Sequence, residues 1–216
     1  MKKIYFLSLF LLTTIIFLDS CSSKEKTKTS KIEISETEVI NAEKIDKDNV
    51  QNYKIDVEKT VVEWIGKKTT GSHNGTVLLE KGVMSINKNG DVVGGKFMIN
   101  MQTIECTDLQ GSKKESLEEH LKDEDFFNTT EHQKASFIIE RVDSINIYGT
   151  ITIKGISEAV NFEYSKLNDY QYEAEITIDR TLFDIKYKSK TIFPELGDNF
   201  IHDNFIIHLN PLSISK

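Results

Sequence analysis

The chain has 216 residues, of which 27 are basic and 34 are acidic, and its formal net charge is −7 at neutral pH. This acidic balance argues against nucleic acid as a partner and against attraction to anionic lipid headgroups, because like charges repel. Only two cysteines are present, Cys21 and Cys106, so the composition does not predict a disulfide framework.

The first 20 residues have the features of a secretion signal. Two lysines precede an apolar run from Ile4 to Leu18, which is shorter than the roughly 20 residues that a membrane span needs. Leu18-Asp19-Ser20-Cys21 then resembles a bacterial lipobox, whose cysteine becomes the lipid-modified first residue. We predict a lipoprotein signal peptide over residues 1–20 and lipid attachment at Cys21, with ordinary signal cleavage as the alternative. The expected location is extracytoplasmic, anchored to a bacterial membrane on its periplasmic side or at the cell surface.

Residues 21–52 differ in composition from the rest of the chain. They are dense in Lys, Glu, Asp, Ser and Thr and contain no aromatic residue, Gly or Pro. Such a stretch cannot bury enough apolar surface to offset the entropy that is lost on ordering. We therefore predict a disordered polar tether here, followed by one folded domain over residues 53–216.

From Tyr53 onward the sequence becomes rich in β-branched and aromatic residues, which favour strands. Asn89-Gly90-Asp91 predicts a tight hairpin turn, and Gly71–Gly75 predicts a second turn. Gly94-Gly95 predicts a bulge or a close approach of two backbones. The strands expected in this half are Thr60–Gly66, Thr76–Leu79, Gly82–Asn87 and Val92–Met101, with Glu80-Lys81 joining the second to the third.

One short helix is expected among the strands. Leu117 to Leu121 is a charged amphipathic turn, and acidic residues and then the adjacent Phe126 and Phe127 follow it. Two adjacent rings cannot both face water cheaply, since each buries about 150–250 Å² when it is packed. At a junction between a helix and a loop both rings can turn toward a sheet. We therefore predict that this segment is a lid over the apolar end of the fold.

The second half of the chain alternates apolar and polar residues with a period of two. Ile147, Ile151 and Ile153 share one face of a strand, and the same alternation recurs around Phe162 and Ile176. Hairpin-connected strands with one apolar face predict an antiparallel sheet, either closed on itself or packed as a sandwich. Because closure leaves no exposed edges, we predict an all-β fold, an antiparallel eight-stranded barrel with one short helix.

The sequence contains no pattern that is typical of an enzyme or a metal site. The five histidines, at positions 73, 120, 132, 202 and 208, lack metal-ligand spacing, and no cysteine cluster accompanies them. Neither a nucleophile elbow nor a phosphate-binding glycine loop is present. We predict no catalytic residue, no metal ligand and no cofactor. A carboxylate pair for glycoside hydrolysis stays open, although nothing singles one out.

Two further side chains have specific expectations. Arg180 continues the inward phase of Ile176 and Ile178, and a buried arginine needs a partner. That partner is either a structural carboxylate or the headgroup of a ligand. Cys106, in a strand, is expected to be a small packed residue.

Short motifs along the chain resemble, in order, the signature of the YceI-like family. No single motif is specific, but the ordered set extends from about Tyr53 to Leu212. The motifs are Trp64-Ile65-Gly66-Lys67-Lys68, Ser72-His73-Asn74-Gly75, Gly94-Gly95-Lys96-Phe97, His120-Leu121, Asp125-Phe126-Phe127, Ala135-Ser136-Phe137, Gly149 to Gly155, Asp179-Arg180-Thr181 and Gly197-Asp198 with Ile201 and Asp203.

The resemblance implies a lipocalin-like barrel that binds long isoprenoid, quinone-like or fatty-acyl lipids without catalysis. The expected partners are this lipid and the membrane, the latter through Cys21, and a homodimer is left open. The alternative is a structural or interaction module whose barrel is filled by its own side chains. The expected ligand-binding residues are Trp64, Val77, Leu79, Phe97, Ile99, Phe126, Phe127, Phe137, Ile151, Ile153, Phe162, Ile176, Ile178 and Arg180.

Overall fold

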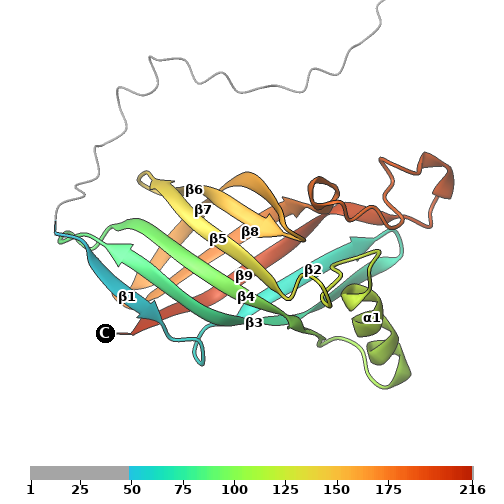
Figure 1. Cartoon of the computed structure of the whole chain (residues 1–216), viewed down its shortest axis with the longest axis horizontal. Coiled ribbons are helices and arrows are strands. Elements are labelled where there is room, and N and C mark those ends of the chain that lie inside the picture. Colours follow the sequence, from blue (N-terminus) through green and yellow to red (C-terminus); the bar gives the residue numbers. More distant parts are fainter. Residues whose placement is uncertain (1–48, 216) are drawn as a thin grey trace, which may run out of the picture. The chain divides into compact units, whose positions relative to one another are not determined.

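The structure is a computed structural model, and it describes residues 49–215. The predicted signal peptide, the lipid attachment at Cys21 and most of the predicted tether lie outside the described residues. Most of the described residues belong to β-strands (Figure 1). The elements are β1 (Gln51–Ile55), β2 (Val62–Lys68), β3 (Gly71–Ile86), β4 (Val92–Cys106), α1 (Ser112–Lys122), β5 (Lys134–Val142), β6 (Asn146–Ile153), β7 (Ile156–Asn168), β8 (Gln171–Asp179), the 3-10 helices η2 (Arg180–Phe183) and η3 (Pro194–Leu196), and β9 (Ile201–Ser215).

The strands form one antiparallel sheet that closes on itself. Their order is β1-β3-β2-β9-β8-β7-β6-β5-β4, and pairing of β3 with β4 closes the ring. Both β1 and β2 lie between β3 and β9: Trp64 of β2 pairs with Gly75 and Ile207, whereas β1 pairs with the far ends of the same two strands. The nine strands therefore occupy eight positions, and the predicted eight-stranded antiparallel barrel is confirmed.

The barrel has two distinct ends (Figure 1). We call the end that carries α1, η2 and η3 the helix end, and the end where β1 pairs with the last residues of β9 the terminal end. Strand β6 shows how the interior is filled, because its residues from Asn146 to Ile153 alternate strictly between half-buried and buried. The predicted period of two thus places one face of each strand in a single apolar core.

The predicted turn at Gly71–Gly75 is wrong, since these residues begin strand β3 and the turn lies at Thr69 and Thr70. Gly75 serves close packing instead. A Cβ atom there would lie 1.8 Å from the carbonyl oxygen of Glu105 and 2.6 Å from the ring of Trp64. The glycine therefore makes room for the indole inside the barrel.

The predicted break at Glu80-Lys81 is a bulge within one continuous strand, because the register of β3 against β4 shifts between Leu79 and Lys81. The close approach predicted at Gly94-Gly95 is confirmed at Gly95, where a Cβ would lie 3.0 Å from the carbonyl oxygen of Val83. The hairpin turn at Asn89-Gly90-Asp91 is also confirmed, with Gly90 at φ +86°.

Helix α1 is longer than predicted, since it begins at Ser112 rather than at Leu117. Its first residues are polar and carry no apolar stripe, so the amphipathic pattern in the sequence starts only at Leu117. The main-chain N–H of Cys106 donates to the Glu118 carboxylate at 2.8 Å, which attaches the helix to the end of β4. The helix is thereby held at the helix end of the barrel.

The folded part begins slightly before the predicted boundary at Tyr53. Strand β1 starts at Gln51, so the last two residues of the predicted tether belong to the barrel. Within residues 49–215, no helix is long and apolar enough to cross a membrane.

Candidate functional site

The barrel encloses a cavity of about 180 Å³, and its lining is almost entirely apolar. Alternate residues of the strands supply this lining, because every second side chain of a strand points to the same face. All side chains that were predicted to bind the ligand lie around this cavity: Trp64, Val77, Leu79, Phe97, Ile99, Phe126, Phe127, Phe137, Ile151, Ile153, Phe162, Ile176, Ile178 and Arg180. Their position is thus established, while their role in binding stays a prediction.

Sequence reasoning missed other side chains that line the cavity. Many of them continue an alternation that the sequence already shows, as Ile147 does for Ile151 and Tyr164 does for Phe162. The alternation of apolar and polar residues along these strands was therefore the signal that could have identified them. The further apolar and aromatic lining residues are Val62, Met84, Met101, Ile104, Leu121, Ala135, Ile139, Ile147, Val160, Tyr164, Tyr172, Ala174, Ile201, Phe205, Ile207, Leu209 and Leu212.

Aromatic rings form one side of the cavity. Phe137 stacks on Phe97 with ring centroids 6.1 Å apart and contacts Phe162 at 5.5 Å. Gly149 makes this arrangement possible, because a Cβ atom at that position would lie 2.7 Å from the Phe137 ring. The strand pairing of β4, β5, β6 and β7 thus places three rings side by side.

Phe126 and Phe127 line the helix end of the cavity. Both rings are buried, 8% and 7% exposed, and they meet edge to face with centroids 5.0 Å apart. Phe127 also contacts Phe205 of β9 at 6.3 Å, and Phe126 contacts His120 of α1 at 5.4 Å. Both rings therefore turn toward the sheet, as the lid prediction requires.

A second, open groove of about 740 Å³ lies outside this lid. Charged side chains line much of it, among them Asp125, Lys154 and Lys186. Phe126 lines the inner cavity, whereas Asp125, its neighbour in the chain, lines the outer groove. The segment from Asp123 to Phe127 is therefore the wall between the apolar interior and a polar surface.

Arg180 is 2% exposed and lines the cavity at the helix end. Its guanidinium donates to the main-chain carbonyls of Ile185, Ile201 and His202 at 2.9, 3.0 and 3.1 Å. The nearest carboxylate oxygen, Oδ1 of Asp203, lies 3.6 Å away. The partners of Arg180 are thus mainly main-chain carbonyls. The sequence had suggested either a carboxylate or a ligand headgroup, and carbonyls were not among these alternatives.

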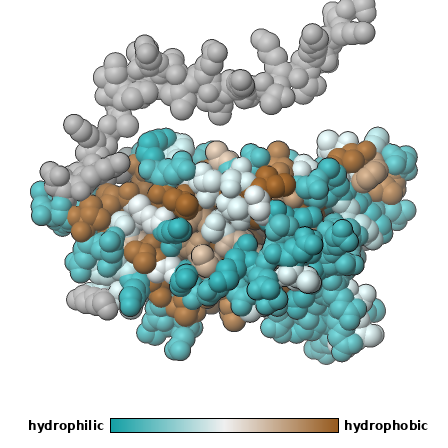
Figure 2. Space-filling model, viewed as in Figure 1, coloured by the Kyte–Doolittle hydropathy of each residue, from teal (hydrophilic) through white to brown (hydrophobic). Residues whose placement is uncertain are grey.

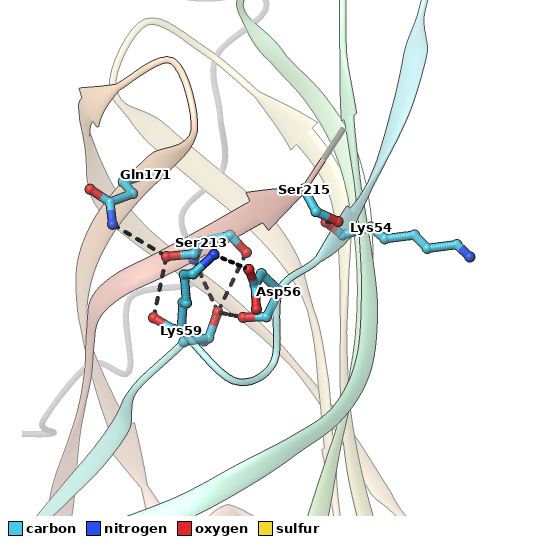
Figure 3. A network of polar contacts seen from close by, with 7 residues as sticks. Lys54, Asp56, Lys59, Gln171, Ser213 and Ser215 are labelled. Atoms are coloured by element: carbon cyan, nitrogen blue, oxygen red, sulfur yellow. Dashed lines mark hydrogen bonds and ion pairs between the residues drawn. The ribbon is translucent and has the colours of Figure 1, made fainter.

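A network of polar contacts lies at the terminal end of the barrel (Figure 3). The loop between β1 and β2 lies against β9, where the main-chain N–H of Ser213 donates to Oγ1 of Thr60 at 3.0 Å. The hydroxyl of Ser213 donates to the carbonyl of Lys59 at 3.2 Å, and Gln171 donates to that hydroxyl at 3.4 Å. These groups hydrogen-bond to one another and join the loop between β1 and β2 to strand β9.

Two polar atoms of the cavity lining have no hydrogen-bond partner within residues 49–215, namely Nε1 of Trp64 and the hydroxyl of Tyr172. Tyr172 is 3% exposed, and burial, with smaller contributions from Tyr164, Asp169 and Tyr53, raises its pKa to about 12. Its hydroxyl therefore stays protonated and neutral.

The cysteine of the barrel is part of a structural chain of contacts. Sγ of Cys106, which is fully buried, donates to Oδ1 of Asp108 at 3.1 Å, and Asp108 pairs through Oδ2 with His73 at 2.9 Å. Burial and the contact with Asp108 raise the pKa of the thiol, which makes it a poor nucleophile. Among the described residues, no three His, Cys, Asp or Glu side chains are grouped as metal ligands.

The fold and the cavity define a class of protein: a closed antiparallel barrel around an apolar interior, as in the lipocalins. The chain belongs to the YceI-like domain family, whose signature matches residues 53–210. A stretch of 52 residues is 38% identical to UPF0312 proteins of Staphylococcus aureus strains USA300 and NCTC 8325 / PS 47. It covers 24% of this chain and 30% of those relatives, so the chain matches less than a third of their length.

Two solved structures have a similar fold. BcnA of Burkholderia cenocepacia is 14% identical, with a TM-score of 0.54 over 75% of this chain and 99% of that one. A polyisoprenoid binding domain from Saccharophagus degradans, implicated in plant cell wall breakdown, is 11% identical, with a TM-score of 0.52 over 76% and 98% of the two chains. At this identity the likeness concerns the fold.

Proposed function

We propose that the chain is a non-catalytic carrier or sensor that binds a long apolar chain, an isoprenoid, quinone-like or fatty-acyl lipid, inside its barrel. The observation that carries this proposal is the cavity inside the barrel, whose lining is almost entirely apolar. Burial of apolar surface contributes about 25 cal/mol per Å², so a long chain gains several kcal/mol before the losses of association. The family membership and the polyisoprenoid binding domain of similar fold support the same class of ligand.

The size of the cavity favours a second candidate, a structural or interaction module with a filled barrel. A volume of about 180 Å³ is below the roughly 300–1,000 Å³ of most ligand pockets. It is close to the size of an apolar cavity that holds one benzene ring, about 150 Å³. A long chain therefore requires the lining side chains to move. The segment with Phe126 and Phe127 is the candidate for this movement, because it lies between the cavity and the outer groove.

Native mass spectrometry of the purified protein separates the two candidates. The carrier retains an apolar adduct, and it takes up a prenyl or fatty-acyl chain again after the adduct has been removed. A protein that stays free of adduct and refuses every such chain is the filled barrel, and that result contradicts the carrier.

We also propose that lipid modification of Cys21 anchors the protein on the extracytoplasmic side of a bacterial membrane. The support is the sequence from the basic start through the apolar run to Cys21. Several acyl chains on one cysteine bind a protein to the membrane far more strongly than a single chain, which gives only marginal binding. The Cys21→Ala variant should therefore leave the membrane fraction after a carbonate wash. Recovery there at wild-type levels contradicts the anchor.

A further inference from the structure

The hydroxyl of Tyr172 is a polar group placed in an apolar space. Tyr172 is 3% exposed and lines the cavity near the terminal end, and its hydroxyl has no partner within residues 49–215. A buried hydroxyl without a hydrogen bond costs about 1–3 kcal/mol of stability. A phenylalanine would avoid this cost, so the hydroxyl calls for a partner that is not part of the chain.

The polar groups beside Tyr172 are already satisfied by one another. Gln171, the preceding residue, donates to the hydroxyl of Ser213, and Ser213 donates in turn to Lys59 (Figure 3). Opposite Tyr172 in the register of the sheet lies Leu212, which is apolar. The buried hydroxyl of Tyr172 is therefore left without a hydrogen-bond partner among these neighbours.

The second unpaired atom of the lining restricts the chemistry of the missing partner. Nε1 of Trp64 can only donate a hydrogen bond, and a tyrosine hydroxyl can also donate. A ligand with hydrogen-bond acceptors could therefore bond to both unpaired atoms. A pure hydrocarbon has no acceptor and could bond to neither.

Charge restricts the partner further. The basic side chains of the described lining are Arg180 and His202, both at the helix end. Arg180 lies eight positions beyond Tyr172 in the chain, roughly 27 Å along the strand direction. Glu173, beside Tyr172, also lines the cavity and is acidic. Lys166 lies opposite Tyr172 in the register of β7, but it is outside the cavity lining and pairs with Asp169 at 3.0 Å. An anionic headgroup near Tyr172 would therefore be buried without a free counter-charge, which is strongly unfavourable.

We propose that the cavity selects, among apolar chains, those that carry a neutral oxygen acceptor such as a carbonyl, and that the hydroxyl of Tyr172 donates to it. This selection rests on the lipid-binding function proposed above and specifies its ligand class. The group would be recognised by one hydrogen bond in a dry site, and its apolar chain would extend from there toward the lid.

The test compares three probes with the same number of carbons: a long-chain methyl ketone, the n-alkane and the fatty acid. Each is titrated against a polarity-sensitive dye bound to the full-length protein. We expect the ketone to bind about tenfold more tightly than the alkane, since one net hydrogen bond is worth about a factor of ten, and the fatty-acid anion to bind more weakly than the ketone. Tyr172→Phe should bind the ketone and the alkane with equal affinity, because the preference depends on the hydroxyl.

The control is Tyr53→Phe, which removes a hydroxyl that bonds to Gln51 at 3.1 Å on a residue outside the cavity lining. This variant should keep the preference. The ligand-free Tyr172→Phe protein should melt no lower than the wild type, because it loses no hydrogen bond. A lower melting temperature shows that the hydroxyl already has a partner, such as a fixed water, and overturns the proposal.

Three binding results also overturn it: equal affinity of the wild type for ketone and alkane, a preference that persists in Tyr172→Phe, or fatty acid that binds as tightly as ketone. In these cases the barrel still binds apolar chains, so the lipid-binding function stands. A wild type that binds neither ketone nor alkane contradicts both proposals.

Discussion

Arg180 and Asp203 lie 3.6 Å apart, measured from Nη2 to Oδ1, but the hydrogen bonds of the guanidinium go to three main-chain carbonyls. Those carbonyls belong to Ile185, just after η2, and to Ile201 and His202 at the start of β9. The buried cation thus joins two segments that are distant in sequence at the helix end of the barrel. Asp203 balances its charge without fixing its geometry.

Replacement of Arg180 should be among the most destabilising changes at the helix end. Arg180→Met removes every donor and leaves the three carbonyls without this partner, so we expect the free energy of unfolding to fall by about 3 kcal/mol or more. Arg180→Lys should recover only part of this loss, because one ammonium group cannot reproduce the fork of the guanidinium. Urea unfolding measures both. If Asp203→Asn costs as much as Arg180→Met, the ion pair and not the carbonyl contacts holds this site.

The pKa of the Asp203 carboxyl predicts a specific dependence of stability on pH. Burial raises this pKa, but hydrogen bonds from the hydroxyls of Ser189 and Thr191 and the charge of Arg180 outweigh burial and lower it. The carboxylate therefore stabilises the fold above about pH 4, and this contribution is lost as the pH falls through the folded-state pKa. Asp203→Asn should show a shallower fall of the thermal midpoint below about pH 4.

Asp184→Asn is the matched control for this titration. The pKa of Asp184 is also lowered, by its contact with Lys186, but both side chains are exposed and salt screens their attraction. At moderate ionic strength its thermal midpoint should follow the wild-type curve. An Asp203→Asn curve that matches the wild type as well would contradict the role given to the buried carboxylate.

The barrel could be predicted from the sequence because the alternation of apolar and polar residues is visible within each single strand and recurs in several of them. The alternation around Ile147 and Ile151 assigns one face of a strand to the interior, whatever the neighbouring strands are. For the same reason every predicted lining residue that belongs to a strand borders the cavity. The paired rings of Phe126 and Phe127 could also be placed, since two adjacent aromatics outside a strand have few ways to avoid water.

The features that sequence reasoning missed depend on contacts between distant residues. The turn signal at Gly75 is misleading, because the indole of Trp64 is what requires a glycine there. The carbonyl partners of Arg180 come from main-chain groups, which no side-chain pattern marks. The unpaired hydroxyl of Tyr172 is visible only once its neighbours have been found to bond to one another.

Gly149 should tolerate no side chain. A Cβ atom there would lie 2.2 Å from the carbonyl oxygen of Ile138 and 2.7 Å from the ring of Phe137, so the strand or the ring must shift. We expect Gly149→Ala to lower the free energy of unfolding by about 1–3 kcal/mol. Gly94→Ala is the control, because the nearest atom to its Cβ would be 3.7 Å away. Its effect in the same urea titration should stay within about 0.5 kcal/mol, and equal losses in both variants would contradict the packing argument.

The lid makes a prediction that stability alone cannot test. Phe126 and Phe127 line the cavity, whereas Phe183 is 1% exposed and does not. All three are phenylalanines near the helix end, so they differ mainly in what lies beside the ring. Phe183 is therefore the control for a ring that is buried purely by protein atoms.

We expect Phe183→Ala to cost about 3–5 kcal/mol of stability in the ligand-free protein, the usual loss for a phenylalanine in a packed core. Phe126→Ala and Phe127→Ala should cost less, because each ring already borders an empty space and fewer contacts are lost. Their affinity for a prenyl chain should fall about tenfold, since the chain loses an apolar surface, whereas Phe183→Ala should bind normally wherever it remains folded. Thermal unfolding and prenyl binding are measured on each protein. If both lid variants unfold as far below the wild type as Phe183→Ala and still bind the chain as before, the two rings belong to the core and do not close the cavity.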